Sequence, residues 1–93
     1  MNEKHIEQAL INATKQRGGK ALKFTSPGWS GAPDRLIILR GGKTGFVELK
    51  APGKKPRPLQ QQRLTWLQNM GHYATWCDNP HDIPRILDEI QTT

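Results

Sequence analysis

The chain of 93 residues has one cysteine, Cys77, which excludes an intrachain disulfide. It also lacks a cluster of cysteine and histidine at zinc-binding spacing, so a structural zinc site is not expected. Neither a signal peptide nor a long apolar run is present, because the amino terminus is polar and charged. We therefore expect no contact with a membrane and a cytosolic location, which would be the host cytoplasm for a viral protein.

Acidic and aromatic residues are also scarce. Eight Asp and Glu stand against fourteen Lys and Arg, giving a net charge of +6, and aromatics make up 6% of the chain. Such an excess of positive charge is typical of proteins that bind polyanions, most often nucleic acid, although it also serves solubility alone. The length predicts one domain over residues 1–93, whose modest core a second copy would help to stabilise.

The spacing of the apolar residues predicts the order helix, three strands, helix, strand, helix. The predicted segments are a helix over residues 2–17, strands over 21–24, 34–39 and 46–50, a helix over 58–70, a strand over 72–77 and a helix over 82–90. Residues 40–45 are expected to form the hairpin connection. The wholly apolar run 36–39 suits a strand buried on both faces. This order predicts an α/β fold with a mixed sheet flanked by helices.

Three polar residues are predicted to meet where two of these strands adjoin. Side chains alternate along a strand, so Glu48 and Lys50 share one face. Asp34 stands at the start of the preceding strand, directly after Pro33. Because a hairpin makes the two strands antiparallel, the start of one lies beside the end of the other. Asp34 is therefore expected close to Glu48 and Lys50.

Two carboxylates and a lysine suit metal-assisted hydrolysis of a phosphodiester. Asp34 and Glu48 offer the hard oxygen ligands that Mg²⁺ prefers, and the backbone carbonyl of Leu49 is a candidate further ligand. The ion would polarise the phosphodiester and acidify a water, while Lys50 would orient that water or stabilise charge on the phosphate. Taken alone, however, Glu-x-Lys is common and equally describes a surface ion pair on an edge strand.

Two further polar residues fall on apolar helix faces. At about 100° per residue, Glu7 lies inside the apolar arc of the first helix, and Gln60 lies inside that of the second. The two glutamines that follow Gln60 fall outside this arc, whereas Trp66 falls inside it and is expected in the core. Both Glu7 and Gln60 remain open between a functional role and that of a boundary residue with an exposed head group.

Basic residues cluster beside the proposed site. Lys54, Lys55 and Arg57 follow the Glu48 strand directly, and Lys23 and Arg35 are expected nearby. Such side chains neutralise backbone phosphates without reading sequence, so we expect them to bind DNA. A solvated face is the alternative for any run of charge. Trp29, in the loop before Asp34, is open between stacking on a base and packing on the core.

Three segments resemble the virus-type replication-repair nuclease (VRR-NUC) domain of the PD-(D/E)xK, or restriction-endonuclease-like, superfamily. They are residues 31–35 (GAPDR), 46–53 (FVELKAPG) and 58–60 (PLQ), and the resemblance extends over residues 7–78. It implies a four-stranded mixed sheet flanked by helices. It assigns Asp34 and Glu48 to metal binding and Lys50 to catalysis. It also matches Glu7 to the first-helix glutamate of the family, as a further metal ligand, and Gln60 to the glutamine that follows the lysine motif, both as part of the catalytic set.

The resemblance further implies a Mg²⁺- or Mn²⁺-dependent endonuclease that cuts DNA. Short phage members of the family resemble archaeal Holliday-junction resolvases, which work as dimers. A junction needs two cuts on opposing strands, and a two-fold dimer offers two matched sites. We therefore predict a homodimer that acts on branched DNA. A DNA-binding module without cleavage and a small interaction protein with an incidental basic face are the alternatives; neither needs inward-facing carboxylates.

Overall fold

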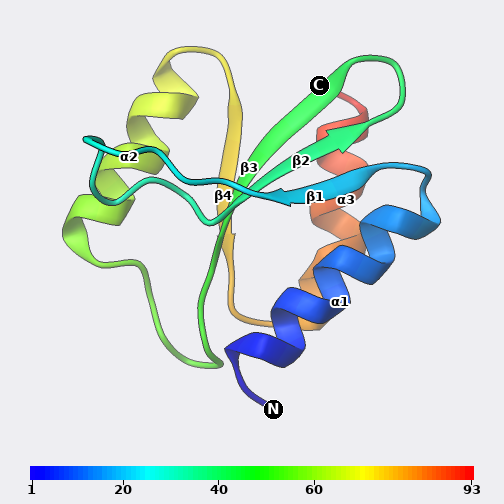
Figure 1. The fold of residues 1–93 in the computed structure, drawn as a ribbon, viewed down its shortest axis with the longest axis horizontal. Helices are drawn as coiled ribbons and strands as arrows, with labels where there is room; N and C mark the ends of the chain where they lie inside the picture. The colour runs from blue at the N-terminus through cyan, green and yellow to red at the C-terminus, as the bar shows by residue number, and fades with distance from the viewer.

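The computed structural model describes residues 1–93 as a single sheet with helices on both faces (Figure 1). The elements are α1 (Glu3–Gln16), β1 (Lys20–Lys23), β2 (Arg35–Leu39), β3 (Lys43–Leu49), α2 (Pro58–Asn69), β4 (Tyr73–Cys77), the 3₁₀ turn η1 (Pro80–Asp82) and α3 (Ile83–Gln91). The strands lie in the order β1-β2-β3-β4; β1 to β3 are antiparallel and β3 pairs with β4 in parallel. The predicted mixed α/β fold is confirmed.

Helix α2 is the crossover between the parallel strands β3 and β4, and it packs on β4. Figure 1 shows α2 on one side of the sheet and α1 and α3 together on the other. None of the three helices has the length and hydrophobicity needed to cross a bilayer.

The main core lies between the sheet and the pair α1 and α3. Alternate residues of β2 and β3 face these helices, and eleven buried side chains form one cluster there: Ile6, Leu10, Ile37, Leu39, Val47, Leu49, Cys77, Ile83, Ile86, Leu87 and Ile90. The cluster under α2 is smaller and consists of Leu64, Leu67 and Ala74. One face of the sheet is thus much better covered than the other.

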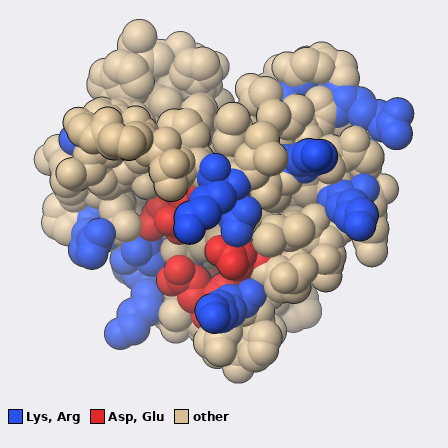
Figure 2. All heavy atoms as spheres, in the orientation of Figure 1, with Lys and Arg blue, Asp and Glu red and all other residues tan.

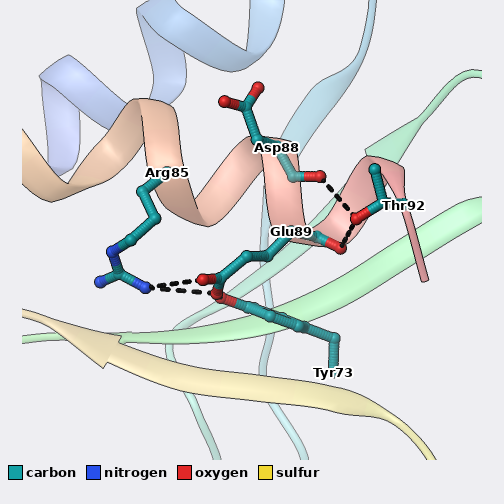
Figure 3. A network of polar contacts seen from close by, with 5 residues as sticks. All are labelled: Tyr73, Arg85, Asp88, Glu89 and Thr92. Carbon is teal, nitrogen blue, oxygen red and sulfur yellow. Dashed lines mark hydrogen bonds and ion pairs between the residues drawn. The ribbon is translucent and has the colours of Figure 1, made fainter.

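A polar network fastens α3 to β4 (Figure 3). The Tyr73 hydroxyl donates to Glu89 Oε1 at 2.7 Å, and the Arg85 guanidinium donates to both Glu89 oxygens at 3.2 and 3.1 Å. These bonds lower the pKa of Glu89, while burial and the Glu89 carboxylate raise the pKa of Tyr73. The Thr92 hydroxyl donates to the carbonyls of Asp88 and Glu89, which satisfies acceptors at the end of the helix.

Two predictions about the strands are wrong. The run 36–39 is not buried on both faces, because α2 covers β4 rather than β2 and leaves Ile38 38% exposed. Strand β3 begins at Lys43 rather than residue 46. Gly41 and Gly42 have φ of +79° and +74°, a conformation that glycine adopts at little cost, so the hairpin turns within residues 40–42.

The expectation that Trp66 lies in the core is also wrong. Its side chain is 52% exposed. Leu64 and Leu67 occupy the side of α2 that faces β4, so the part of the apolar arc that carries Trp66 turns away from the sheet.

Gly45 of β3 makes room for α3. A Cβ at this position would lie 2.8 Å from Ile90 Cδ1 and Cγ1, and Ile90 is fully buried. Overpacking of this kind costs about 1–3 kcal/mol, so we expect Gly45→Ala to lower the free energy of unfolding by that amount in urea titrations. Thr44→Ala, at the exposed neighbouring position, is the control. An unchanged midpoint for Gly45→Ala would contradict this packing.

Candidate active site

The proposed site lies where β2 begins and β3 ends. Arg35 of β2 pairs with Val47 of β3 in the antiparallel register, so Asp34 comes alongside Glu48. The predicted proximity of these two carboxylates follows from the hairpin.

Asp34 is fixed by the backbone of β3. Its Oδ2 accepts the N–H of Leu49 at 3.0 Å. Leu49 lies beyond the stretch of β3 that pairs with β2, because β2 starts only at Arg35. Pro33, which precedes Asp34 in the chain, is buried. The aspartate side chain therefore continues the hydrogen bonding of the sheet where the strand pairing stops. In doing so it is held at the end of β3.

Glu48 is a buried carboxylate with one unsatisfied oxygen. Its side chain is 2% exposed, its Oε2 lies 3.2 Å from Lys50 Nζ, and its buried Oε1 has no hydrogen-bond partner. Burial, and next the negative charge of Asp34, raise the pKa of Glu48 from 4.5 to about 7, although Lys50 opposes this rise. A buried carboxylate whose oxygen lacks a partner is costly in free energy, so this arrangement would be stabilised by a cation bound to Glu48.

The residues present fit a magnesium-like ion. No three acidic, histidine or cysteine side chains are grouped closely enough to hold a metal by themselves. Mg²⁺, however, is commonly held by one or two carboxylates and completes its shell with waters and substrate phosphate. Asp34 and Glu48 would supply those carboxylates if such an ion were bound. The Leu49 N–H bonds to Asp34, and since the N–H and C=O of a strand residue point to the same side, the Leu49 carbonyl is directed there too.

Gln60 lies in the first turn of α2 and is 8% exposed, while Gln61 and Gln62 are exposed, as the helical period predicted. Its Oε1 accepts the backbone N–H of Arg57 at 2.9 Å. This bond satisfies a donor at the start of the helix and joins α2 to the basic loop, leaving the amide nitrogen as the donor end.

Glu7 of α1 is not grouped with the other two carboxylates. It is 42% exposed and pairs with Arg35 at 3.1 Å. Arg35 alternates to the opposite face from Asp34, is 12% exposed, and also donates to the Ala21 carbonyl at 3.0 Å. The Arg35 guanidinium thus holds α1 against β1 and β2. Its ion pair and hydrogen bond occupy the guanidinium in the free protein, and a contact between Arg35 and DNA stays a prediction.

The remaining basic residues predicted to bind DNA are exposed. Lys54, Lys55 and Arg57 lie in the loop between β3 and α2, and Lys23 ends β1. Figure 2 shows acidic side chains gathered near the middle of one face, with Lys and Arg side chains around them. A phosphate backbone would meet positive charge on either side of the carboxylates.

Sequence reasoning missed Asp78, which directly follows β4. Its Oδ2 accepts the N–H of Gly53 at 3.2 Å and so ties the basic loop to the end of β4. The available signal was its position, because parallel β3 and β4 end at the same edge of the sheet.

No family model matches the chain, but individual proteins do. The protein "Putative nuclease p44" of Acyrthosiphon pisum secondary endosymbiont phage 1 is 42% identical over 90 residues, covering 97% of this chain and 96% of that protein. A solved structure described as "VRR_NUC domain" superposes with a TM-score of 0.85 at 26% identity, covering 92% of this chain and 94% of that one. Another, "VRR_NUC domain protein", superposes with a TM-score of 0.66 at 23% identity and covers 98% of this chain and 86% of that one. At this identity the likeness supports the shared fold and nothing further.

The raised pKa of Glu48 gives a pH dependence of stability. The folded carboxyl gives up its proton less readily than the unfolded one, so the native protein loses stability as pH rises from 4.5 to about 7. Glu48→Gln carries no charge. We expect urea titrations without metal to find this variant about 3 kcal/mol more stable than the native protein near pH 8, with no such gain near pH 4.

Glu89→Gln is the control of opposite sign. Hydrogen bonds from Tyr73 and Arg85 lower the pKa of Glu89, so removing this charge should destabilise the protein near pH 8. A Glu48→Gln variant less stable than the native protein near pH 8 would show that Glu48 is not a strained carboxylate.

Proposed function

Because the chain belongs to the VRR-NUC family and is a nuclease, we propose that it is a Mg²⁺- or Mn²⁺-dependent endonuclease that hydrolyses DNA phosphodiester bonds. The observation that carries this proposal is the unsatisfied Oε1 of buried Glu48 beside Asp34. A structural carboxylate would be expected to find a partner for each oxygen, whereas a metal ligand keeps one for the ion.

Asp34, Glu48 and the Leu49 carbonyl would hold the ion, which when bound supplies positive charge to polarise the phosphodiester and acidify water. The Asp34 carboxylate is positioned for this by its bond to Leu49 N–H, so little rearrangement is needed. Glu48 must be ionised to act, and the ammonium group of Lys50 favours the ionised form.

Lys50 is the proposed catalytic cation. Its side chain is 15% exposed and its Nζ lies 3.2 Å from Glu48 Oε2. From there it can orient a water for attack and donate hydrogen bonds to phosphate oxygens as their negative charge grows. Gln60 is assigned a neighbouring role, in which its amide nitrogen donates to the substrate while its carbonyl oxygen holds the start of α2.

Glu7 is proposed to act on the site from a greater distance than Asp34 and Glu48. Its ion pair with Arg35 supports the strand that follows Asp34, so its loss should disturb the site indirectly. We expect Glu7→Gln to reduce cleavage less than Asp34→Asn does.

The proposed substrate is branched DNA, and the proposed active species is a homodimer. One protomer carries one Asp34–Glu48–Lys50 site, and cuts on two strands of a junction need two such sites in a fixed relation. The exposed basic loop favours binding of the sugar-phosphate backbone rather than of base edges.

Cleavage of a labelled panel tests the chemistry. The panel contains a four-way junction, a flap, a single strand and a supercoiled plasmid, each with Mg²⁺ or Mn²⁺. We expect Asp34→Asn and Lys50→Ala to cut roughly 100-fold or more slowly, because each removes a charge that acts on the reacting phosphate. Asp88→Asn, whose carboxylate is 70% exposed on α3, is the control. Binding by the native protein without cleavage in either metal would indicate a DNA-binding module instead.

Binding without metal tests the basic loop. Each phosphate contact in duplex DNA contributes roughly −0.9 to the slope of log K against log salt. We therefore expect Lys54→Ala and Lys55→Ala to weaken binding on every DNA sequence alike and to flatten that slope by about 0.9 each. Lys15→Ala, an exposed lysine in the last turn of α1, should change neither quantity. If all three variants had the same slope of log K against log salt, the loop would not be part of the DNA-binding surface.

A further inference from the structure

One side of α2 is apolar but uncovered. Leu59, Trp66 and Met70 are 40%, 52% and 60% exposed, and with Arg63 they follow one another at intervals of four, three and four residues. Residues at this spacing form a single stripe along a helix. We call these four residues the α2 stripe. It lies beside the buried residues of the same helix, and about half of its apolar surface stays exposed within one copy of the chain.

The α2 stripe is held rigidly by the loop before Asp34. The ring of Trp29 packs edge to face on Trp66, with centroids 5.6 Å apart at 71°. The Arg63 guanidinium lies 5.1 Å from the centroid of Trp29, and its Nε donates to the Ser30 carbonyl at 2.8 Å. Side chains that are already ordered lose little entropy on binding, and tryptophan and arginine are the residues most often found at binding hot spots.

The composition of α2 favours a protein partner over nucleic acid. Its twelve residues, PLQQQRLTWLQN, contain one charged side chain, whereas 24% of the whole chain is charged. Interface cores are depleted in charge and enriched in aromatic residues, methionine and arginine. Nucleic-acid surfaces need several lysines and arginines, and here those lie in the loop 50–57 that precedes the helix.

Charge also limits where a second copy of the same chain could bind. Each copy carries a net charge of +6, so two copies repel one another across most of their surfaces. The nearly neutral α2 is a surface where they can meet with little repulsion.

The stripe is complementary to itself. When two α2 helices run antiparallel about a two-fold axis midway between Arg63 and Trp66, Leu59 of each copy faces Met70 of the other. In the same register, Arg63 of each copy faces Trp66 of the other. The first pairing is apolar against apolar, and the second brings a guanidinium to an indole, which attract one another. An arrangement in which the same patch serves both copies is the usual form of a two-fold dimer.

We propose that the α2 stripe is the surface on which a second copy of this chain docks, with the two α2 helices antiparallel. This inference rests on the homodimer of the proposed function and names the surface that forms it. Because α2 is about 18 Å long, antiparallel pairing would place the two basic loops at opposite ends of the helix pair. Each active site would then meet a different stretch of the DNA.

Charge exchange across the two-fold axis provides the test. Sedimentation velocity without DNA or metal should find the native protein dimeric, and Leu59→Glu or Met70→Lys alone should raise the dimer dissociation constant roughly 10- to 100-fold. The double variant Leu59→Glu/Met70→Lys should restore the dimer, because each glutamate then faces a lysine of the other copy. Within one copy the two positions are about 16 Å apart along the helix, so no intrachain pair can restore it.

Leu22→Glu is the matched control, since Leu22 is 42% exposed on β1 and lies outside the stripe. If Leu22→Glu dissociates the dimer and Leu59→Glu does not, the dimer interface lies on the sheet at β1 and not on the α2 stripe. Dimeric single variants that no longer retain DNA would make the stripe a nucleic-acid surface. A native protein that is monomeric but cuts DNA would overturn the stripe and the homodimer alone, whereas a dimer that cuts nothing would overturn the proposed chemistry alone.

Discussion

The hydrogen bond from Leu49 N–H to Asp34 Oδ2 links the fold to the site. It extends the hydrogen bonding between the two strands to Leu49, two residues beyond Val47, the last residue of β3 that pairs with β2, and a carboxylate replaces the missing carbonyl. The same bond brings Asp34 close enough to raise the pKa of Glu48. The Asp34 side chain therefore has two roles. It satisfies the Leu49 N–H at the end of the hairpin, and it brings a second carboxylate next to Glu48.

The neighbourhood of Asp34, Glu48 and Lys50 could be predicted from the sequence because it depends on two local rules, the alternation of a strand and the antiparallel course of a hairpin. The inward position of Gln60 could be predicted for a similar reason. The partner of Glu7 could not, because the period of a helix fixes which residues share a face but not how that face rotates against the sheet. The partners of Arg35 were equally out of reach, since one step along β2 takes this side chain from the face of Asp34 to the face of α1.

The exposure of Trp66 shows what periodicity leaves out. The apolar arc of α2 is wider than the strip that contacts β4, and only Leu64, Leu67 and Gln60 are buried on this helix. An apolar residue on an amphipathic helix can be covered by its own chain or by another molecule, and the sequence pattern is the same in both cases. The distinction depends on where the sheet ends beneath the helix, which is a tertiary property.

One face of the sheet provides most of the stability of the fold, and the other carries the candidate active site. On the face of α1 and α3, eleven buried side chains form a continuous core, and the Tyr73–Glu89 bond secures the last helix. That stability allows the opposite face to contain a buried carboxylate with an unsatisfied oxygen, a feature that by itself disfavours folding at neutral pH. The loop that ends in Asp34 packs on α2 through Gly31 and Leu59 as well as through Trp29 and Trp66. A partner docked on α2 would therefore contact the residues that hold the loop before Asp34, and docking would affect the position of this aspartate.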